Sequence, residues 1–259
     1  MIYKKLVQKI MTPRENFYKD GYLIVPNFIK SENFIKLSDE LNLEIQKKLD
    51  NIELKKIGGY KIGNLGLDAG IYASKIWELI LKQNFEKLIS QILEKSLSDF
   101  TIRVSGNICF PNKGEQHFHT DGKYEEKMYL VSVATQDINE SSGPTEVVLN
   151  SHNKIPYWKF FFKKKEKKKI ILSKGDLIIR KHSAWHRGTK NLSNKPRFLI
   201  AFLLFYKNPN IKSNLNQNSD IKIFNNFFSS TSFGRFKEFI YIKFNYIFIF
   251  YKLLRSIFD

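Results

Sequence analysis

The sequence is poor in cysteine. Its 259 residues include a single one, Cys109, so a disulfide within the chain and a metal cluster built on cysteines are both excluded. A lone thiol is typical of a reducing compartment, and Lys4, Lys5 and Lys9 interrupt the apolar residues at the start. We therefore expect no signal peptide, and a cytoplasmic protein that can associate with the periphery of a membrane.

Acidic residues are also scarce. There are 25 of them against 43 lysines and arginines, which gives a formal net charge of +18 at pH 7. Such a charge concentrates anions near the surface, whether nucleic acid, anionic lipid, or a phosphorylated or carboxylate substrate. The abundance of Lys, Asn, Ile and Phe offers a plainer cause, a bias of composition, and the charge alone does not choose between the two.

Long hydrophobic runs are missing as well. No uninterrupted apolar run reaches the ~18–20 residues that a membrane-spanning helix requires. The apolar segment 235–259 is predicted to be an amphipathic helical extension whose polar residues share one narrow side. Three roles suit it: packing on the domain, a dimer contact, or lying on an anionic membrane surface. Residues 207–234, rich in Asn and Ser, are predicted to be a linker before it.

The rest of the chain, 1–206, is predicted to be one domain, since 42% hydrophobic residues suffice for a sizeable core. Its part 14–97 has helical periodicity, with Ser31 as a helix cap and a glycine-rich loop at 56–70. From 101 to 206, short strand-like runs alternate with turn signals, which favours a mainly β fold with flanking helices: a β-sandwich, barrel or jelly roll. The predicted strands are 101–110, 115–121, 128–137, 145–149, 170–172, 176–180 and 196–206.

Histidine is rare too, with five in the chain. His119 and Asp121 stand at positions i and i+2, a spacing that directs both side chains to the same face of a strand. His186 lies beside another predicted strand. Two imidazoles and one carboxylate on one face of an octahedral ion leave three positions open, which is the facial triad of non-haem Fe(II) oxygenases. The open positions let O2 and a bidentate co-substrate bind together.

Arg197 stands at the start of the apolar strand 196–206. If its strand is adjacent and antiparallel to that of His186, its guanidinium points into the same interior. A buried arginine needs a carboxylate partner, because an unpaired buried charge is costly. The distal carboxylate of 2-oxoglutarate would be a bidentate partner.

With these motifs in order, the sequence resembles the phytanoyl-CoA dioxygenase (PhyH-like) family of Fe(II)/2-oxoglutarate-dependent oxygenases. The resemblance spans roughly residues 14–206. It implies a double-stranded β-helix (jelly-roll) core, with His119, Asp121 and His186 as the catalytic iron ligands and Arg197 as the residue that binds the co-substrate. The matching stretches are FYKDGYLIVPNFI near the start, HTD at 119–121, DINESSGPTEVVLNSHNK at 137–154, GDLIIRKHSAWHRGTKN at 175–191 and KPRFLIAFLLF at 195–205.

The resemblance also implies a reaction. Fe(II), 2-oxoglutarate and O2 would oxidise a small-molecule substrate, anionic or lipid-linked, with release of succinate and CO2. Halogenating relatives lack the carboxylate ligand, so the presence of Asp121 favours hydroxylation or a related oxidation. Thr135 and Asn107 are weaker candidates for contacts with the co-substrate. The oligomeric state stays open, and nucleic acid is not expected as a partner.

Two other functions remain open at this stage. One is a basic module that binds nucleic acid or a membrane surface on an inactive jelly roll, using the lysine run 163–169 and the segment 235–259. The other is a metal-dependent oxygenase that does not use 2-oxoglutarate. Among the other histidines, His117 is expected near the ligands or facing solvent, His182 is a less favoured zinc-type partner of His186, and His152 is expected in a turn.

Overall fold

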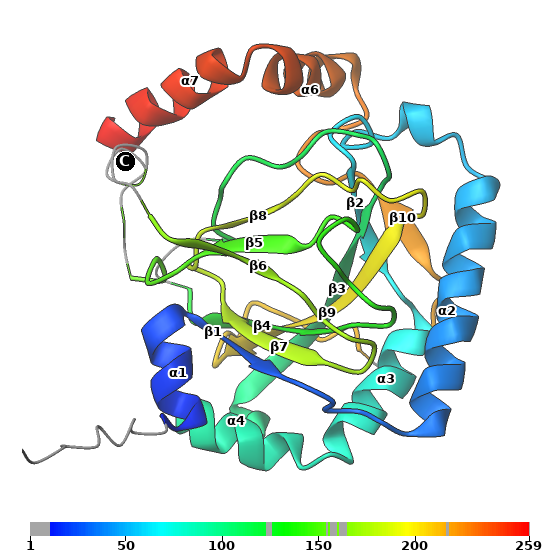
Figure 1. The fold of residues 1–259 in the computed structure, drawn as a ribbon, viewed down its shortest axis with the longest axis vertical. Coiled ribbons are helices and arrows are strands. Elements are labelled where there is room, and N and C mark those ends of the chain that lie inside the picture. Colours follow the sequence, from blue (N-terminus) through cyan, green and yellow to red (C-terminus); the bar gives the residue numbers. More distant parts are fainter. Residues whose placement is uncertain are drawn as a thin grey trace, which may run out of the picture.

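The strands of the computed structural model form two antiparallel sheets (Figure 1). The structure describes residues 11–122, 126–153, 155, 160, 165–215 and 218–258, with side chains up to residue 254. The larger sheet has seven strands in the order β1 (Tyr22–Val25), β7 (Leu177–Lys181), β4 (Met128–Val133), β9 (Arg197–Tyr206), β3 (Phe100–Cys109), β2 (Asn64–Asp68) and β10 (Lys222–Phe224). The smaller sheet has three, in the order β6 (Lys167–Ile170), β5 (Thr145–Val148) and β8 (His186–Gly188).

Alternation of side chains gives each central strand of the larger sheet two different faces. On β9, Phe198, Ile200, Phe202 and Leu204 enter the main hydrophobic core, whereas Arg197, Leu199 and Ala201 face a cavity on the other side. On β7, Leu177 and Ile179 face the core, and Ile178 and Arg180 face the cavity. The side facing the smaller sheet is therefore where polar chemistry can be placed.

Helices cover the outer face of the larger sheet (Figure 1). Ser31 caps α2 as expected, because its side chain accepts a hydrogen bond from the backbone N–H of Phe34. Trp77 of α3 (Ile71–Leu81) packs against Phe202 of β9 with the two rings tilted and 4.8 Å between their centroids, which joins the helices to the sheet. The helices before the core are α1 (Pro13–Asp20), α2 (Glu32–Asp50), α3 (Ile71–Leu81) and α4 (Phe85–Leu93), with the 3-10 turns η1 (Leu54–Lys56) and η2 (Leu97–Asp99). The predicted fold class, mainly β with flanking helices, is confirmed.

Several local predictions differ from the structure. The glycine-rich loop at 56–70 contains β2, and the Asn/Ser-rich linker at 207–234 contains β10, which pairs with β2. Both strands are short, and each adopts strand structure only because it pairs with a segment that is distant in sequence. Residues 115–121 form a single bridge, at His119, instead of a full strand. The division of the chain at 206 and 234 stays a prediction.

The C-terminal extension is not the single helix that we expected over 235–259. It consists of two helices, α6 (Ser232–Lys243) and α7 (Asn245–Phe258), along one side of the molecule (Figure 1). Phe244 separates the two helices, because its backbone, with φ −125° and ψ 53°, is not in the helical conformation. No helix in the described part of the chain is long and apolar enough to cross a membrane.

A buried carboxylate holds α6 to the body of the protein. Glu238 is 1% exposed, and one of its oxygens accepts hydrogen bonds from the backbone N–H groups of Gly59, Lys61 and Ile62 at 3.1, 2.9 and 3.2 Å. Hydrogen bonds to an ionised acceptor are stronger than neutral ones. These contacts tie the C-terminal helices to the loop that leads into β2.

We expect Glu238→Ala to lower the free energy of unfolding by about 3 kcal/mol, because three backbone N–H groups, two of them in buried hydrogen bonds, lose their acceptor. Glu238→Gln, which keeps an acceptor oxygen but removes the charge, should fall between this variant and the wild type. Denaturant unfolding measures the change. The control is Glu53→Ala, which removes an exposed pair with Lys56 and should cost about 0.5 kcal/mol or less. Equal effects at both positions would contradict the anchoring role.

Candidate metal and co-substrate site

A cavity of about 200 Å³ lies between the two sheets. This is below the ~300 Å³ at the lower end of ligand pockets, so it can hold a small acid and the reacting end of a substrate, but not a large substrate. The larger sheet supplies Ser105, Asn107, Ser132, Ile178, Arg180, Arg197 and Leu199 to its wall, the smaller sheet supplies Thr145, Ile170, His186 and Gly188, and the segment between them supplies His119 and Asp121.

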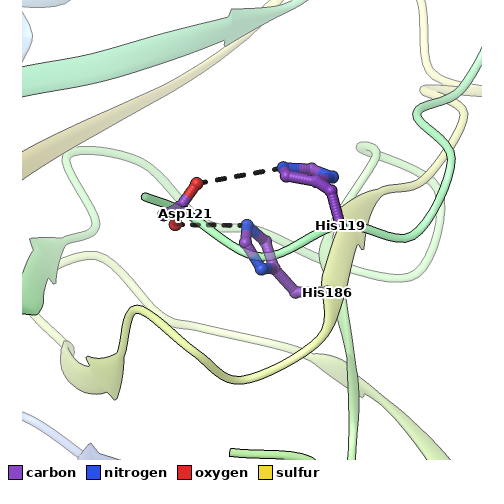
Figure 2. Close-up of side chains that lie close together, drawn as sticks. All are labelled: His119, Asp121 and His186. Carbon is purple, nitrogen blue, oxygen red and sulfur yellow. Dashed lines mark ion pairs between the residues drawn. The ribbon is translucent and has the colours of Figure 1, made fainter. Parts of the chain in front are cut away.

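His119, Asp121 and His186 converge on one point at this cavity (Figure 2). One potential ligand atom from each lies within 4.8 Å of the others. The Nε2 atom of His119 is 3.9 Å from Oδ1 of Asp121, and Nε2 of His186 is 3.5 Å from its Oδ2. The arrangement is therefore close enough for one cation to be shared by all three side chains.

Backbone pairing explains why residues so far apart in sequence meet. His119 and His186 exchange two backbone hydrogen bonds, N–H to O in each direction at 2.9 Å. The N–H of Asp121 donates to the carbonyl of His182, also at 2.9 Å. The HTD segment thus lies antiparallel to β8 and the turn before it. Because i and i+2 share a face, both of its ligands point toward His186.

Hydrogen bonds at the far side of each ring leave the inner nitrogen free for a metal. The Nδ1 atom of His119 lies 2.9 Å from the carbonyl of His117, and Nδ1 of His186 lies 3.0 Å from the carbonyl of Ala184. A carbonyl can only accept, so Nδ1 of His119 carries the proton and its Nε2 keeps a lone pair. Nδ1 of His186 faces both the Ala184 carbonyl, which can only accept, and Nη1 of Arg180, which can only donate. This support of ligand tautomers is usual in metal sites.

Arg180 is a charged residue at this site that the sequence analysis did not single out. Its Nη2 donates to Oδ2 of Asp121 at 2.6 Å, and its Nη1 lies 3.0 Å from Nδ1 of His186. The guanidinium therefore holds the carboxylate in position from one side and leaves Oδ1 on the side of His119. Its position on β7, two residues after Ile178, was a usable signal, because alternation places both on one face.

Burial and neighbouring charges keep the three side chains in the protonation states that a metal requires. Burial lowers the pKa of His119, and burial with the Arg180 charge lowers the pKa of His186 well below its usual value. For Asp121, burial acts to raise the pKa, but His186 and Arg180 outweigh it and hold this pKa below its ordinary range. Neutral imidazoles and an ionised carboxylate are the forms that bind a divalent cation, so the residues fit one.

Arg197 brings a second positive charge into the cavity. It is 1% exposed, its Nη1 donates to Oδ1 of Asn107, and its Nη2 donates to the carbonyl of Gly143 at 2.8 Å. Its Nε has no partner, and no carboxylate of the described residues forms an ion pair with it. Burial lowers its pKa. A buried guanidinium with neutral partners is costly on its own and suits an anionic ligand.

Two expectations about these residues are wrong. His186 and Arg197 do not lie on adjacent strands: β8 belongs to the smaller sheet and β9 to the larger one, and the two side chains reach the cavity from opposite sheets. Thr135 does not reach the cavity. It is fully buried, and its hydroxyl donates to Oδ1 of Asn42 on α2 at 3.0 Å, so it joins the helix to the sheet. Asn107 does line the cavity.

The remaining histidines have structural partners. His117 stacks on Tyr241 of α6 at 3.6 Å between ring centroids, with an interplanar angle of 13°. Burial, with nearby positive charges, lowers the pKa of His117 to about 4. His182 lies with Nδ1 2.8 Å from the carbonyl of Met128, away from the ligand cluster, and His152 is buried against Gly21. The lysine run 163–169 lies partly outside the described residues; Lys167–Lys169 are exposed on β6.

The segment 224–227 is a part of the cavity wall that the sequence analysis missed, because it lies in the predicted linker. Phe224, Asn226 and Phe227 line the cavity, and both phenylalanines are about half exposed. The ring of Phe227 meets that of His119 edge-on, with 4.9 Å between centroids. Only the pairing of β10 with β2 brings this segment to the site, so no local pattern could have revealed it.

We expect metal binding to withstand mild acidification. Protons compete with the metal for each Nε2, and a lowered pKa moves this competition to lower pH. Titration with Co(II) should show nearly the same affinity at pH 8 and at pH 6. If both imidazoles had the usual pKa near 6.5, the affinity would instead fall about tenfold between these two pH values. His119→Ala, a control without one ligand, should bind at least about tenfold more weakly at both values. A tenfold fall for the wild type would contradict the lowered pKa values.

Comparison with known proteins places this geometry in a family. A profile described as Phytanoyl-CoA dioxygenase (PhyH) matches residues 17–199. No curated protein sequence matches the chain. Among solved structures, the chain is similar to the non-haem alpha-ketoglutarate-dependent carbocyclase SnoK from nogalamycin biosynthesis, with 14% identity, 84% of this chain and 97% of that chain covered, and a TM-score of 0.55.

Two further structures were solved with the co-substrate. The epimerase SnoN in complex with Fe3+, alpha-ketoglutarate and nogalamycin RO has 15% identity, 77% and 86% coverage, and a TM-score of 0.52. EvdO2 from Micromonospora carbonacea var. aurantiaca, complexed with 2-oxoglutarate, has 11% identity, 75% and 89% coverage, and a TM-score of 0.53. At these identities the structures show a shared fold, and the profile shows the family. The chain belongs to the phytanoyl-CoA dioxygenase family, and it is an Fe(II)- and 2-oxoglutarate-dependent oxidoreductase that consumes O2.

Proposed function

We propose that His119, Asp121 and His186 hold the Fe(II), that Arg197 binds the distal carboxylate of 2-oxoglutarate with Asn107 beside it, and that the enzyme hydroxylates a small-molecule substrate. One observation carries this assignment: the buried guanidinium of Arg197 has no carboxylate partner among the described residues, and it faces the same small cavity as the three ligands. A dicarboxylate spanning the cavity would meet a cation at one end and the arginine at the other.

The charges in the cavity suit this ligand. Asp121 contributes one negative charge, and Arg180 and Arg197 contribute two positive ones, so the protein alone leaves an excess of positive charge before any metal is added. A dianion such as 2-oxoglutarate offsets that excess. In a site of low dielectric this complementarity is worth more than it would be in water.

The protein's part in the reaction is to orient the three side chains and to exclude water from the reacting atoms. When bound, Fe(II) brings 2-oxoglutarate and O2 together and supplies the oxidising chemistry that ends in succinate and CO2. The carbonyls of His117 and Ala184 fix the two imidazoles, and Arg180 fixes the carboxylate of Asp121. Apolar side chains of both sheets, among them Ile178 of the larger sheet and Ile170 of the smaller one, keep bulk water from the reacting atoms.

The substrate is proposed to be anionic or lipid-linked. The cavity is too small for a large molecule, so most of the substrate would lie outside it, near the half-exposed Phe224 and Phe227. The exposed lysines of β6 and the net charge of +18 would attract an anionic group. SnoK and SnoN carry out a carbocyclisation and an epimerisation on a similar fold, so an oxidation other than hydroxylation is the second candidate outcome.

An anaerobic titration tests the assignment. Adding 2-oxoglutarate to the Fe(II)-loaded protein should produce a weak visible charge-transfer band, and admitting O2 should then yield succinate. Iron binding without this band would point to a metal-dependent oxygenase that does not use 2-oxoglutarate. Failure to bind iron, with salt-sensitive binding of polyanions instead, would point to a basic binding module on an inactive jelly roll.

We expect Arg197→Ala to weaken 2-oxoglutarate binding by about 30- to 150-fold, since a bidentate charge-assisted pair contributes about 2–3 kcal/mol. Its metal affinity should change little, because Arg197 does not contact the three ligands. Thr135→Val, at the position that faces α2, is the matched control and should leave 2-oxoglutarate affinity unchanged. The measurement is the titration of the visible band, with circular dichroism to check the fold. Unchanged affinity in Arg197→Ala would contradict the assignment.

A further inference from the structure

The two C-terminal helices expose an apolar face to the outside. Large hydrophobic side chains on α6 and α7 are between 37% and 68% exposed, a density that soluble surfaces seldom show. They recur at helical spacing, and both helices lie along the same side of the molecule (Figure 1). These side chains are Phe233, Phe236, Phe239, Ile242, Tyr246, Ile247, Phe250, Tyr251 and Leu254.

The inward side of the same helices combines one buried carboxylate with aromatic side chains. Glu238 is buried on the backbone of the loop at 59–62. Tyr241 is buried against His117 and Phe228. Lys252 is partly buried, and burial lowers its pKa. The helix pair is thus anchored through Glu238 and through the aromatic cluster of Tyr241 and Phe248, and its exposed apolar side chains have no cover within the described part of the chain.

Charge decides which occupant suits this face. The sequence from 229 to 259 has five basic residues and two acidic ones, the buried Glu238 and Asp259. Lys237 and Lys243 are exposed on α6 beside the aromatic side chains. A second copy of the chain would bring another +18 charges to the contact, whereas an anionic lipid surface has the opposite sign. The basic residues are Arg235, Lys237, Lys243, Lys252 and Arg255.

We propose that the apolar face of α6 and α7 docks on an anionic membrane surface. Apolar and aromatic side chains would enter the boundary between headgroups and acyl chains, and the exposed lysines would contact the phosphates. Neither helix can span a bilayer, so the contact is peripheral and parallel to the surface. Exposed aromatic side chains joined to basic residues are typical of such interfacial helices.

This contact lies next to the metal ligands. His117, which stacks on Tyr241 and meets Phe248 of α7, stands two residues before His119. Phe228, packed on Tyr241, follows Phe227 of the cavity wall. Docking would therefore bring the membrane close to the cavity. The docking itself does not depend on the chemistry proposed above.

Co-sedimentation of the full chain with vesicles tests the proposal. We expect binding to phosphatidylcholine vesicles that contain about one third phosphatidylserine, and at least tenfold weaker binding to phosphatidylcholine alone. The double variant Phe236→Ser/Phe250→Ser should lose at least tenfold in affinity for the anionic vesicles. The matched control is Leu43→Ser/Leu192→Ser, which removes two side chains of similar exposure, 56% and 63%, from elsewhere on the surface and should bind as the wild type does.

A second variant separates charge from apolar contact. Lys237→Glu/Lys243→Glu should lose at least tenfold on anionic vesicles while its weak binding to neutral vesicles stays unchanged. Sedimentation velocity without lipid tests whether a second copy of the chain covers the apolar face. If the wild type is a dimer and Phe236→Ser/Phe250→Ser is a monomer, the proposal is overturned in favour of a second copy. A monomeric protein that does not bind anionic vesicles would overturn the proposal as well. Titration of all variants with Fe(II) and 2-oxoglutarate shows separately whether the metal site is intact.

Discussion

Two backbone hydrogen bonds between His119 and His186 hold the site together. They join the extended HTD segment to β8 of the smaller sheet, and so fix the spacing of two imidazoles and one carboxylate that come from distant parts of the chain. The side-chain geometry follows from this bridge, because alternation then directs His119 and Asp121 to the same side. The tautomer of His119 depends on the same segment, since the carbonyl that its Nδ1 contacts belongs to His117.

The second constraint is electrostatic. Between the sheets, Arg180 and Arg197 are both buried, and of the two arginines only Arg180 pairs with Asp121 among the described residues. A fold retains a buried charge without a partner only at a cost in stability, which a bound anion can offset. This charge distribution is the basis for proposing a cation at Asp121 and an anion at Arg197. The walls that separate these charges from water are the inward faces of strands whose outward faces form the main core.

The segment after the core is part of the same construction. β10 extends the larger sheet, Phe227 touches the ring of His119, and Glu238 fixes α6 to the loop before β2. Because Glu238 and Tyr241 are used for this anchoring, the phenylalanines on the other side of α6 are left outside. One arrangement therefore accounts both for the closed wall of the cavity and for the apolar surface beside it.

The sequence by itself determined the fold class, the order of most core strands, and the candidates His119, Asp121, His186 and Arg197, because alternation, turn residues and motif order are local properties. It could not determine that Thr135 faces α2, that His186 and Arg197 come from opposite sheets, or that Arg180 pairs with Asp121. It also left β2 and β10 as loop and linker, and the C-terminal helices as one. These features were decided by tertiary structure. Each depends on which distant segment supplies a hydrogen-bond partner or a packing surface, and a local sequence pattern does not identify that segment.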